Sequence, residues 1–186
     1  MSASGDSTLR LWDLDTGETL RTFVGHRSIV RAVILVDGGR IVTASNDHTL
    51  RVWDIKSGKS LRTLVGHLGL VRGVAAIDTR RIISASDDCT LGVWDIESGK
   101  RHRTHRSHWG WIEAIDVVDR NLVVYASTDN TLRVWNVYTG AQMGKFTLDS
   151  GATSVTVFPS DSGKTIVVGD DAGGVHVLDL VRRSKA

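Results

Sequence analysis

Apolar and polar residues alternate along the chain in short runs, and this pattern predicts β-strands. In the run TLRVWD, Leu50 and Val52 alternate with Arg51 and Trp53, which gives a period of two residues. A strand has this period, whereas a helix would repeat every 3.6 residues. The runs are about five to eight residues long, and turn sequences such as DGGR and NDH separate them. We therefore expect an all-β fold built from many short strands.

The runs recur with a period of 41 residues, which is marked by a Trp near the end of one strand. The Trp positions are Trp12, Trp53, Trp94 and Trp135. A fifth copy, GGVHVLDL, places Leu178 in the Trp position, 43 residues after Trp135. A Gly-His or Ser-His pair lies upstream of the last three Trp positions, at Gly25-His26, Gly66-His67 and Ser107-His108. Each repeat therefore contains about four strands, and the repeat decides the architecture.

These repeats resemble the WD-repeat (WD40) family, whose repeats of about 40–45 residues form four strands and carry a GH…WD signature. The resemblance extends from about Ser2 to Leu180. It implies an all-β fold, a β-propeller of four-stranded antiparallel blades around a central channel. The last segment resembles the final blade of large bacterial WD-repeat proteins, in which the propeller acts as a sensor or scaffold.

We expect about four to five blades in an incomplete ring within a propeller domain over residues 1–181. The predicted units are a partial blade at 1–24, full blades at 25–65, 66–106 and 107–148, a degenerate final blade at 149–180, and a short basic tail at 181–186. The first unit lacks its innermost strand, and the last lacks its outermost strand. Seven blades, the common number in the family, would need roughly 290 residues.

Three arrangements remain open for such an incomplete ring. The chain is a fragment of a longer protein, a closed five-bladed ring, or an arc that another copy completes, and we favour the fragment. Open edges would allow self-association, because unpaired strand edges invite further pairing.

The resemblance implies a hydrogen-bonded chain in each full blade, formed by a His, a Ser or Thr, an Asp and a Trp. The Asp would cap the turn between the second and third strands, and the buried Trp N–H would need an acceptor. The matching residues are His26, Ser45, Asp47 and Trp53, then His67, Ser86, Asp88 and Trp94, then His108, Ser127, Asp129 and Trp135. We interpret them as structural, and not as catalytic or metal-binding, because the same set recurs from blade to blade.

The resemblance also implies a partner-binding face on the loops that carry the His and Asp residues. The positions that match are Ile29, Arg31, Asn46, Leu70, Arg72, Asp87, Trp111, Glu113 and Thr128. We add Trp109, which follows His108 and would form an exposed aromatic pair with Trp111. Trp and Arg are frequent anchors at binding interfaces. We therefore predict a non-catalytic scaffold or sensor that binds a partner protein or peptide on this face.

A second hypothesis is binding of nucleic acid or another anion through the segment RHRTHRSH (101–108) together with Arg31 and Arg72. The formal net charge is only +2, whereas phosphate binding needs clustered positive charge, so we favour a protein partner. His102, His105 and His108 would alternate between the faces of a strand, so we expect no metal site there.

The cysteine content, the apolar runs and the N-terminus bear on the cellular compartment, and the motifs bear on catalysis. Cys89 is the one cysteine, so no intrachain disulfide can form, and this suits a reducing compartment. No apolar run approaches the ~20 residues of a membrane-spanning helix, and the N-terminus has no signal-peptide pattern. We expect a cytoplasmic protein without a membrane partner or cofactor. No motif for nucleophilic catalysis is present, so we expect no enzymatic activity.

Overall fold

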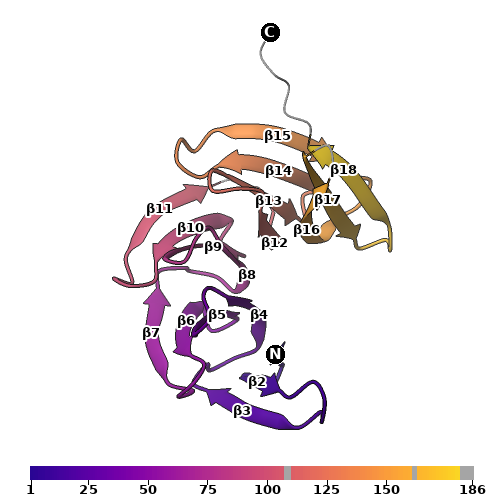
Figure 1. Cartoon of the computed structure of the whole chain (residues 1–186). Coiled ribbons are helices and arrows are strands. Elements are labelled where there is room, and N and C mark those ends of the chain that lie inside the picture. The colour runs from indigo at the N-terminus through magenta and orange to yellow at the C-terminus, as the bar shows by residue number, and fades with distance from the viewer. Residues whose placement is uncertain (107–109, 161–162, 181–186) are drawn as a thin grey trace.

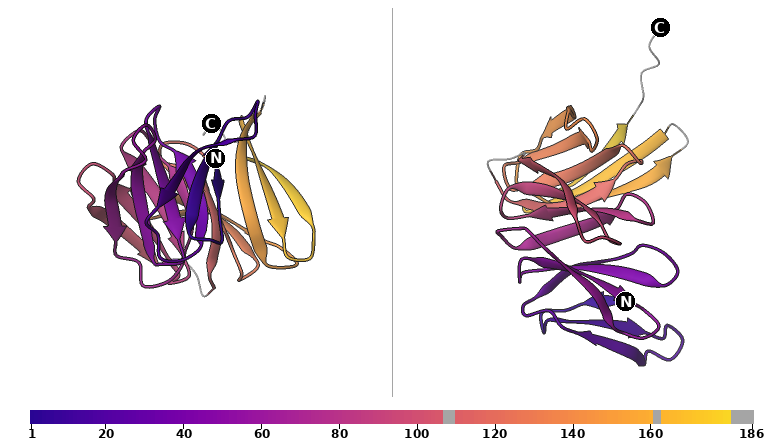
Figure 2. Two further views of the ribbon diagram at one scale, coloured as in Figure 1. Left: turned by 90° about the horizontal axis from the view of Figure 1, so that it is seen from below. Right: turned by 90° about the vertical axis from the view of Figure 1, so that its left-hand side faces the viewer.

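The computed structural model describes residues 1–106, 110–160 and 163–180, and their strands form five antiparallel sheets. The sheets lie side by side around an arc, with the N-terminal and C-terminal sheets at its two ends (Figure 1). Seen from the side, they stack one on another along the chain (Figure 2). The described residues form strands and turns without a helix. The prediction of an all-β, open propeller of antiparallel four-stranded blades is therefore confirmed.

The three central sheets have four strands each, which follow one another from the inside of the arc to its outside. The first sheet contains β4 (Val30–Leu35), β5 (Arg40–Ser45), β6 (Thr49–Asp54) and β7 (Ser60–Val65). The second contains β8 (Val71–Ala76), β9 (Arg81–Ser86), β10 (Thr90–Asp95) and β11 (Arg101–Arg106). The third contains β12 (Ile112–Val117), β13 (Leu122–Ser127), β14 (Thr131–Asn136) and β15 (Gln142–Thr147).

The two end sheets have three strands each. The N-terminal sheet contains β1 (Ser2–Ala3), β2 (Thr8–Trp12) and β3 (Thr19–Val24). The C-terminal sheet contains β16 (Ala152–Ser160), β17 (Gly163–Asp170) and β18 (Val175–Leu180). Compared with the central sheets, the first has no strand beyond β1 on the inner side, and the last has none beyond β18 on the outer side, within the described ranges.

Each central sheet buries apolar side chains on both of its faces. In β5, Ile41 packs with Leu9 of the N-terminal sheet, whereas its neighbour Val42 packs with Ile82 of the next sheet. A strand that is buried on both faces consists of a nearly continuous apolar run, which explains the sequence IVTAS. The apolar core therefore lies in layers between adjacent sheets.

The outward faces of the two end sheets have no such cover. Val52 in β6 is 2% exposed, whereas Val177, at the same place in β18, is 65% exposed. Leu14 follows β2 as Ile96 follows β10, and these two side chains are 94% and 3% exposed. Exposed apolar residues at positions that are otherwise buried make both ends of the arc apolar surfaces, which none of the described blades covers.

A hydrogen-bonded chain crosses the first central sheet. His26 Nδ1 lies 2.8 Å from Asp47 Oδ2, and its Nε2 lies 2.7 Å from Thr43 Oγ1. The indole N–H of Trp53 donates to the same hydroxyl at 2.8 Å. Asp47 also caps its turn by accepting the backbone N–H of Thr49 at 3.0 Å. In the second sheet, the same contacts join His67, Asp88, Ser84 and Trp94.

The hydroxyl in this chain is Thr43 or Ser84, and the expectation of Ser45 and Ser86 is corrected. Register gives the reason, because Trp53 is paired with Ile41 across β5 and β6. A side chain two residues from the directly paired one remains within reach of an aromatic ring, and that residue is Thr43.

Ser45 and Ser86 are buried nearer to the turn and serve its backbone. The Ser45 hydroxyl donates to the carbonyl of Ser28 at 3.0 Å and accepts the N–H of Asp47 at 3.1 Å. Ser86 accepts the N–H of Asp88 at 3.2 Å, and Ser127 accepts that of Asp129 at 3.3 Å. These serines are therefore structural, but they do not link His to Trp.

The third central sheet departs from this arrangement, because Tyr125 stands where Thr43 and Ser84 stand in the others. The Tyr125 ring packs on Trp135 with centroids 6.4 Å apart, and His105 packs on the same indole at 5.5 Å. Among the described residues, the Trp135 N–H has no hydrogen-bond partner. His108, the predicted member of this set, lies outside the described residues. Aromatic packing therefore replaces the Trp hydrogen bond of the other two sheets.

We predict that Thr43→Val destabilises the chain by roughly 1–3 kcal/mol for each buried group left without a partner, His26 and Trp53. The free energy of unfolding in urea measures this loss. Ser2→Ala is the matched control, because Ser2 accepts the Trp12 N–H at 2.8 Å in the N-terminal sheet, where the bond is exposed. Water can replace that acceptor, so the control should cost much less. Equal stability of Thr43→Val and the parent chain would refute the corrected assignment.

Candidate functional site

The His–Asp pairs resemble part of a catalytic triad, because a hydroxyl, an imidazole and a carboxylate stand in line. Burial lowers the pKa of His26, although the hydrogen bond that its imidazole donates to Asp47 opposes that effect. Burial alone would raise the pKa of Asp47, but hydrogen bonds from Thr49, the Arg27 amide and His26 lower it to about 2.

The position of the hydroxyl argues for a structural role. Thr43 is fully buried and already accepts the N–H of Trp53, so its oxygen is not presented to a substrate. Ser84 is equally buried and accepts the N–H of Trp94. In the first two central sheets, this hydrogen-bonded chain therefore ties the loop that precedes the first strand to the turn between the second and third strands. It fixes the face on which partner binding was predicted.

Four of the predicted partner-binding residues come together on that face. The guanidinium of Arg72 bonds both carboxylate oxygens of Asp87, at 2.8 and 3.0 Å, and reaches Glu113 at 3.2 Å. The same guanidinium lies 5.7 Å from the ring centre of Trp111. Arg72, Asp87 and Glu113 are mostly buried, whereas Trp111 is 52% exposed. The cluster therefore holds one large aromatic ring at the surface.

The backbone of Trp111 is fixed as well. Its N–H donates to Thr128 Oγ1 and its carbonyl accepts the N–H of Thr128, both at 3.1 Å. Asn46 bonds the carbonyl of Ile29 in the same way, at 2.9 Å. In both sheets, the segment that precedes the first strand is thus hydrogen-bonded to the turn that follows the second strand. The predicted positions on these two segments therefore lie next to one another.

The other predicted positions are distributed along the same set of loops. Exposed Arg31 donates to Asn46 Oδ1 at 3.0 Å. Leu70 is half-buried, and its carbonyl accepts the N–H of Asp87 at 2.9 Å. Trp109 lies outside the described residues, so its pairing with Trp111 stays a prediction.

Arg101, part of the basic strand predicted for anion binding, has an internal role. Strand β10 carries Gly92 where β6 carries Arg51, and a Cβ at Gly92 would lie 2.9 Å from Arg101 Nε. Arg101 lies 5.1 Å from the Trp94 ring centre, as Arg51 lies 5.8 Å from that of Trp53. It also donates to the carbonyl of Gly66 at 2.7 Å. Arg101 thus replaces the missing arginine of its blade.

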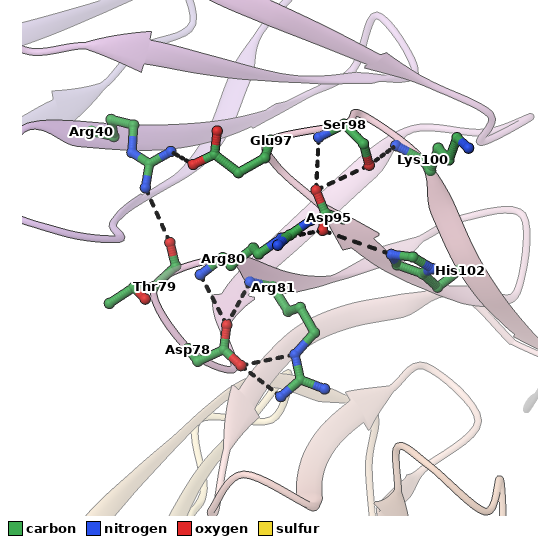
Figure 3. A network of polar contacts seen from close by, with 10 residues as sticks. All are labelled: Arg40, Asp78, Thr79, Arg80, Arg81, Asp95, Glu97, Ser98, Lys100 and His102. Atoms are coloured by element: carbon green, nitrogen blue, oxygen red, sulfur yellow. Dashed lines mark hydrogen bonds and ion pairs between the residues drawn. The ribbon is translucent and has the colours of Figure 1, made fainter.

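The opposite face carries a network of ion pairs that the sequence analysis did not identify (Figure 3). Arg81 bonds Asp78 through Nε and Nη2 at 2.8 and 2.6 Å, and Arg80 bonds Asp95 at 2.5 Å. The N–H of Ser98 and the guanidinium of Arg80 hold the pKa of Asp95 well below its usual range.

This network extends to the neighbouring blade through Arg40. Arg40 bonds Glu97 and also donates to the carbonyl of Thr79 at 3.2 Å. The pairs Asp37–Arg40 and Asp78–Arg81 stand at equal places in two repeats. That recurrence is the signal that could have revealed the network from the sequence.

The described residues include no cluster of three or more His, Cys, Asp or Glu side chains placed to hold a metal ion. Within the described ranges, no helix has the length and apolar character needed to span a membrane. Cys89 lies in the turn between β9 and β10, partly buried, with Sγ 3.7 Å from the carbonyl oxygen of Asp87.

Two family models match this chain. Residues 17–54 and 58–95 match the WD domain, G-beta repeat. Residues 108–180 match the TEP-1 C-terminal beta-propeller. Together these matches extend over most of the chain.

Known proteins give the same result. The WD repeat-containing protein pop1 of Schizosaccharomyces pombe is 42% identical over 43 residues, which are 23% of this chain and 6% of that protein. The crystal structure of the WD40 beta propeller domain of Doa1 is similar with a TM-score of 0.85 and 26% identity, over 94% of this chain and 58% of that chain. The chain thus spans only part of the length of either protein. The repeated sheets, the family matches and the structural similarity show that the chain belongs to the WD-repeat (WD40) family of β-propellers.

Proposed function

We propose that this chain is a non-catalytic binding module that holds a partner protein or peptide on the face around Trp111. Propellers of this family generally mediate protein–protein interactions. Loops held by a rigid scaffold are common places for binding residues. Here contacts with Arg72 and Thr128 hold Trp111, and its exposed ring supplies the contact surface.

The observation that carries this proposal is an exposed Trp whose surroundings are already ordered. Arg72 supports the ring from one side, Asp87 and Glu113 fix Arg72, and Thr128 fixes the backbone. A preorganised aromatic side chain loses little conformational entropy on binding, so more of its contact energy appears as affinity.

The charge of the cluster indicates the kind of partner. One guanidinium stands against two carboxylates, so the cluster has one carboxylate in excess. A partner that presents an apolar group beside a cationic group therefore fits better than an anionic one. Arg72 and Arg101, two of the cations on which the nucleic-acid alternative depends, are both engaged within the protein, which favours a protein partner.

We propose further that the uncovered end sheets are covered by additional blades in the functional protein. The positions that are exposed at Leu14 and Val177 are buried or partly buried at the equivalent places of the central sheets. The similar Doa1 chain is longer than this one. A second copy of the chain is the alternative cover, and the kinship with bacterial sensor proteins stays a hypothesis.

We predict that Trp111→Ala weakens binding of the partner by tenfold or more, roughly 1.4 kcal/mol, as expected of an aromatic anchor. The measurement is affinity capture with the tagged chain, followed by quantification of the captured proteins. Phe158→Ala is the control, because Phe158 is 50% exposed and lies in the C-terminal sheet.

Both variants should melt at the temperature of the parent chain. A Trp111→Ala variant that captures the same proteins in the same amounts would show that this face does not bind the partner.

A structural role for the histidines also predicts how stability depends on pH. Burial lowers the pKa values of His26 and His105, so below about pH 6.5 the unfolded chain binds more protons than the folded one. Stability should therefore fall as the pH is lowered from 7 to 5, and His105→Leu should reduce the slope. Asp47, with a folded pKa of about 2, should add a further loss between about pH 4 and 2. Urea unfolding over this range measures the effect, and stability that is constant or rises toward pH 5 would contradict it.

A further inference from the structure

A cavity of about 250 Å³ opens between the second and third central sheets, on the face opposite to Trp111. Its floor is apolar and consists of Ile77, Val93 and Val137. Its rim contains Arg81, His102, Arg103 and Tyr138. Ile77 follows the end of β8, and Arg81 begins β9, which places the opening beside the ion pairs of Figure 3.

A β-bulge aims two consecutive residues of β11 at this cavity. Arg101 pairs with Trp94 and Arg103 pairs with Val93, so His102 is an extra residue in β11. A bulge redirects side chains that would otherwise alternate between faces, so His102 and Arg103 line the same cavity. The first central sheet has the same bulge but carries Leu61 in place of His102.

A second departure from the repeat moves Arg103 away from the glycine that its equivalents cover. The equivalent residues are Arg21 in the N-terminal sheet and Arg62 in the first central sheet. Each lies over the glycine that follows the third strand of the next sheet. A Cβ at Gly58 would lie 2.9 Å from Arg21 Cδ, and one at Gly99 would lie 2.7 Å from Arg62 Cδ. At Gly140, the nearest atom is instead His105 Cε1, at 2.9 Å.

His105 therefore lies over Gly140, where the repeat would place Arg103. Arg103 is exposed, and no hydrogen bond or ion pair joins it to the described residues. The equivalent of His105 in the first central sheet is the buried Leu64, so the exchange is particular to this blade.

The other charges at the rim are compensated. Arg81 is paired with Asp78, and its guanidinium also lies 5.2 Å from the ring centre of Tyr138. His102 lies 3.9 Å from Asp95, which Arg80 binds. The cavity thus combines an apolar floor, an aromatic wall and one unpaired cation, Arg103.

We propose that this cavity binds one aromatic or large aliphatic side chain of an extended acidic peptide, whose carboxylate pairs with Arg103. Two observations favour a peptide over a small molecule. The volume is below the roughly 300–1,000 Å³ of typical small-molecule sites, yet larger than a cavity of about 150 Å³ that holds a benzene ring. In addition, β11 is the end strand of its sheet, so its outer backbone groups are available to pair with an extended peptide. This site is independent of the proposed function of the Trp111 face.

The test is a titration of the full chain with the peptide acetyl-Asp-Phe-Asp-Gly-amide at low salt. Changes in the backbone NMR chemical shifts of the protein measure the binding. We expect saturable shifts in β11 and around Tyr138. Replacing Phe by Ala in the peptide should weaken binding at least tenfold, and replacing both Asp by Asn should weaken it at least fivefold.

Arg103→Gln should also weaken binding at least fivefold, whereas Arg62→Gln, the matched arginine of the preceding blade, should leave it unchanged. Tyr138→Ala, which removes the aromatic wall of the cavity without adding a charge, should weaken binding as well. Absence of shifts at the cavity, or equal loss with Arg62→Gln, would overturn the site. Phenylacetate binding as tightly as the peptide would overturn the peptide as its occupant.

Discussion

Each central sheet of this propeller is apolar on both faces, so it can bury its side chains only between two other sheets. Ile41 and Val42 are neighbours in β5 and lie in two different core layers. Burial of apolar surface is the dominant favourable contribution to folding, and here nearly all of it occurs between blades. The stability of one blade therefore depends on its neighbours, which is the behaviour expected of repeat architectures.

The hydrogen-bonded chains add specific polar contacts to this apolar packing. They join the loop between two sheets to the turn between the second and third strands of the later sheet. They also give the indole N–H of Trp53 or Trp94 a buried acceptor. Because the loops are held in this way, side chains on them can be presented without a large entropic cost. Trp111 lies in the third sheet, where this hydrogen-bonded chain is not formed among the described residues, and Arg72 and Thr128 hold it instead.

The period of 41 residues predicted the sheets well, because spacing and alternation determine which residues become strands. The identity of the linking hydroxyl was predicted wrongly, because it depends on which residue lies diagonal to Trp53 across the pair β5–β6. The ion pairs of Arg40 and Arg81 were not recognised, since surface charges are common and only their recurrence distinguishes them. The cavity beside Arg103 could not be predicted at all. It results from three side-chain exchanges, at residues 102, 105 and 138, that come together only in the folded chain.

The central claim is that every sheet needs a neighbour on both faces, and the uncovered end sheets test it most directly. The measurement is the mass of the purified chain in solution, by light scattering after size exclusion, over a range of concentrations. If Leu14 and Val177 mark true open faces, the chain should associate, and its mass should rise with concentration. A chain that stays monomeric at all concentrations and melts in a single cooperative transition would contradict the account, because its end sheets would then be satisfied within one molecule.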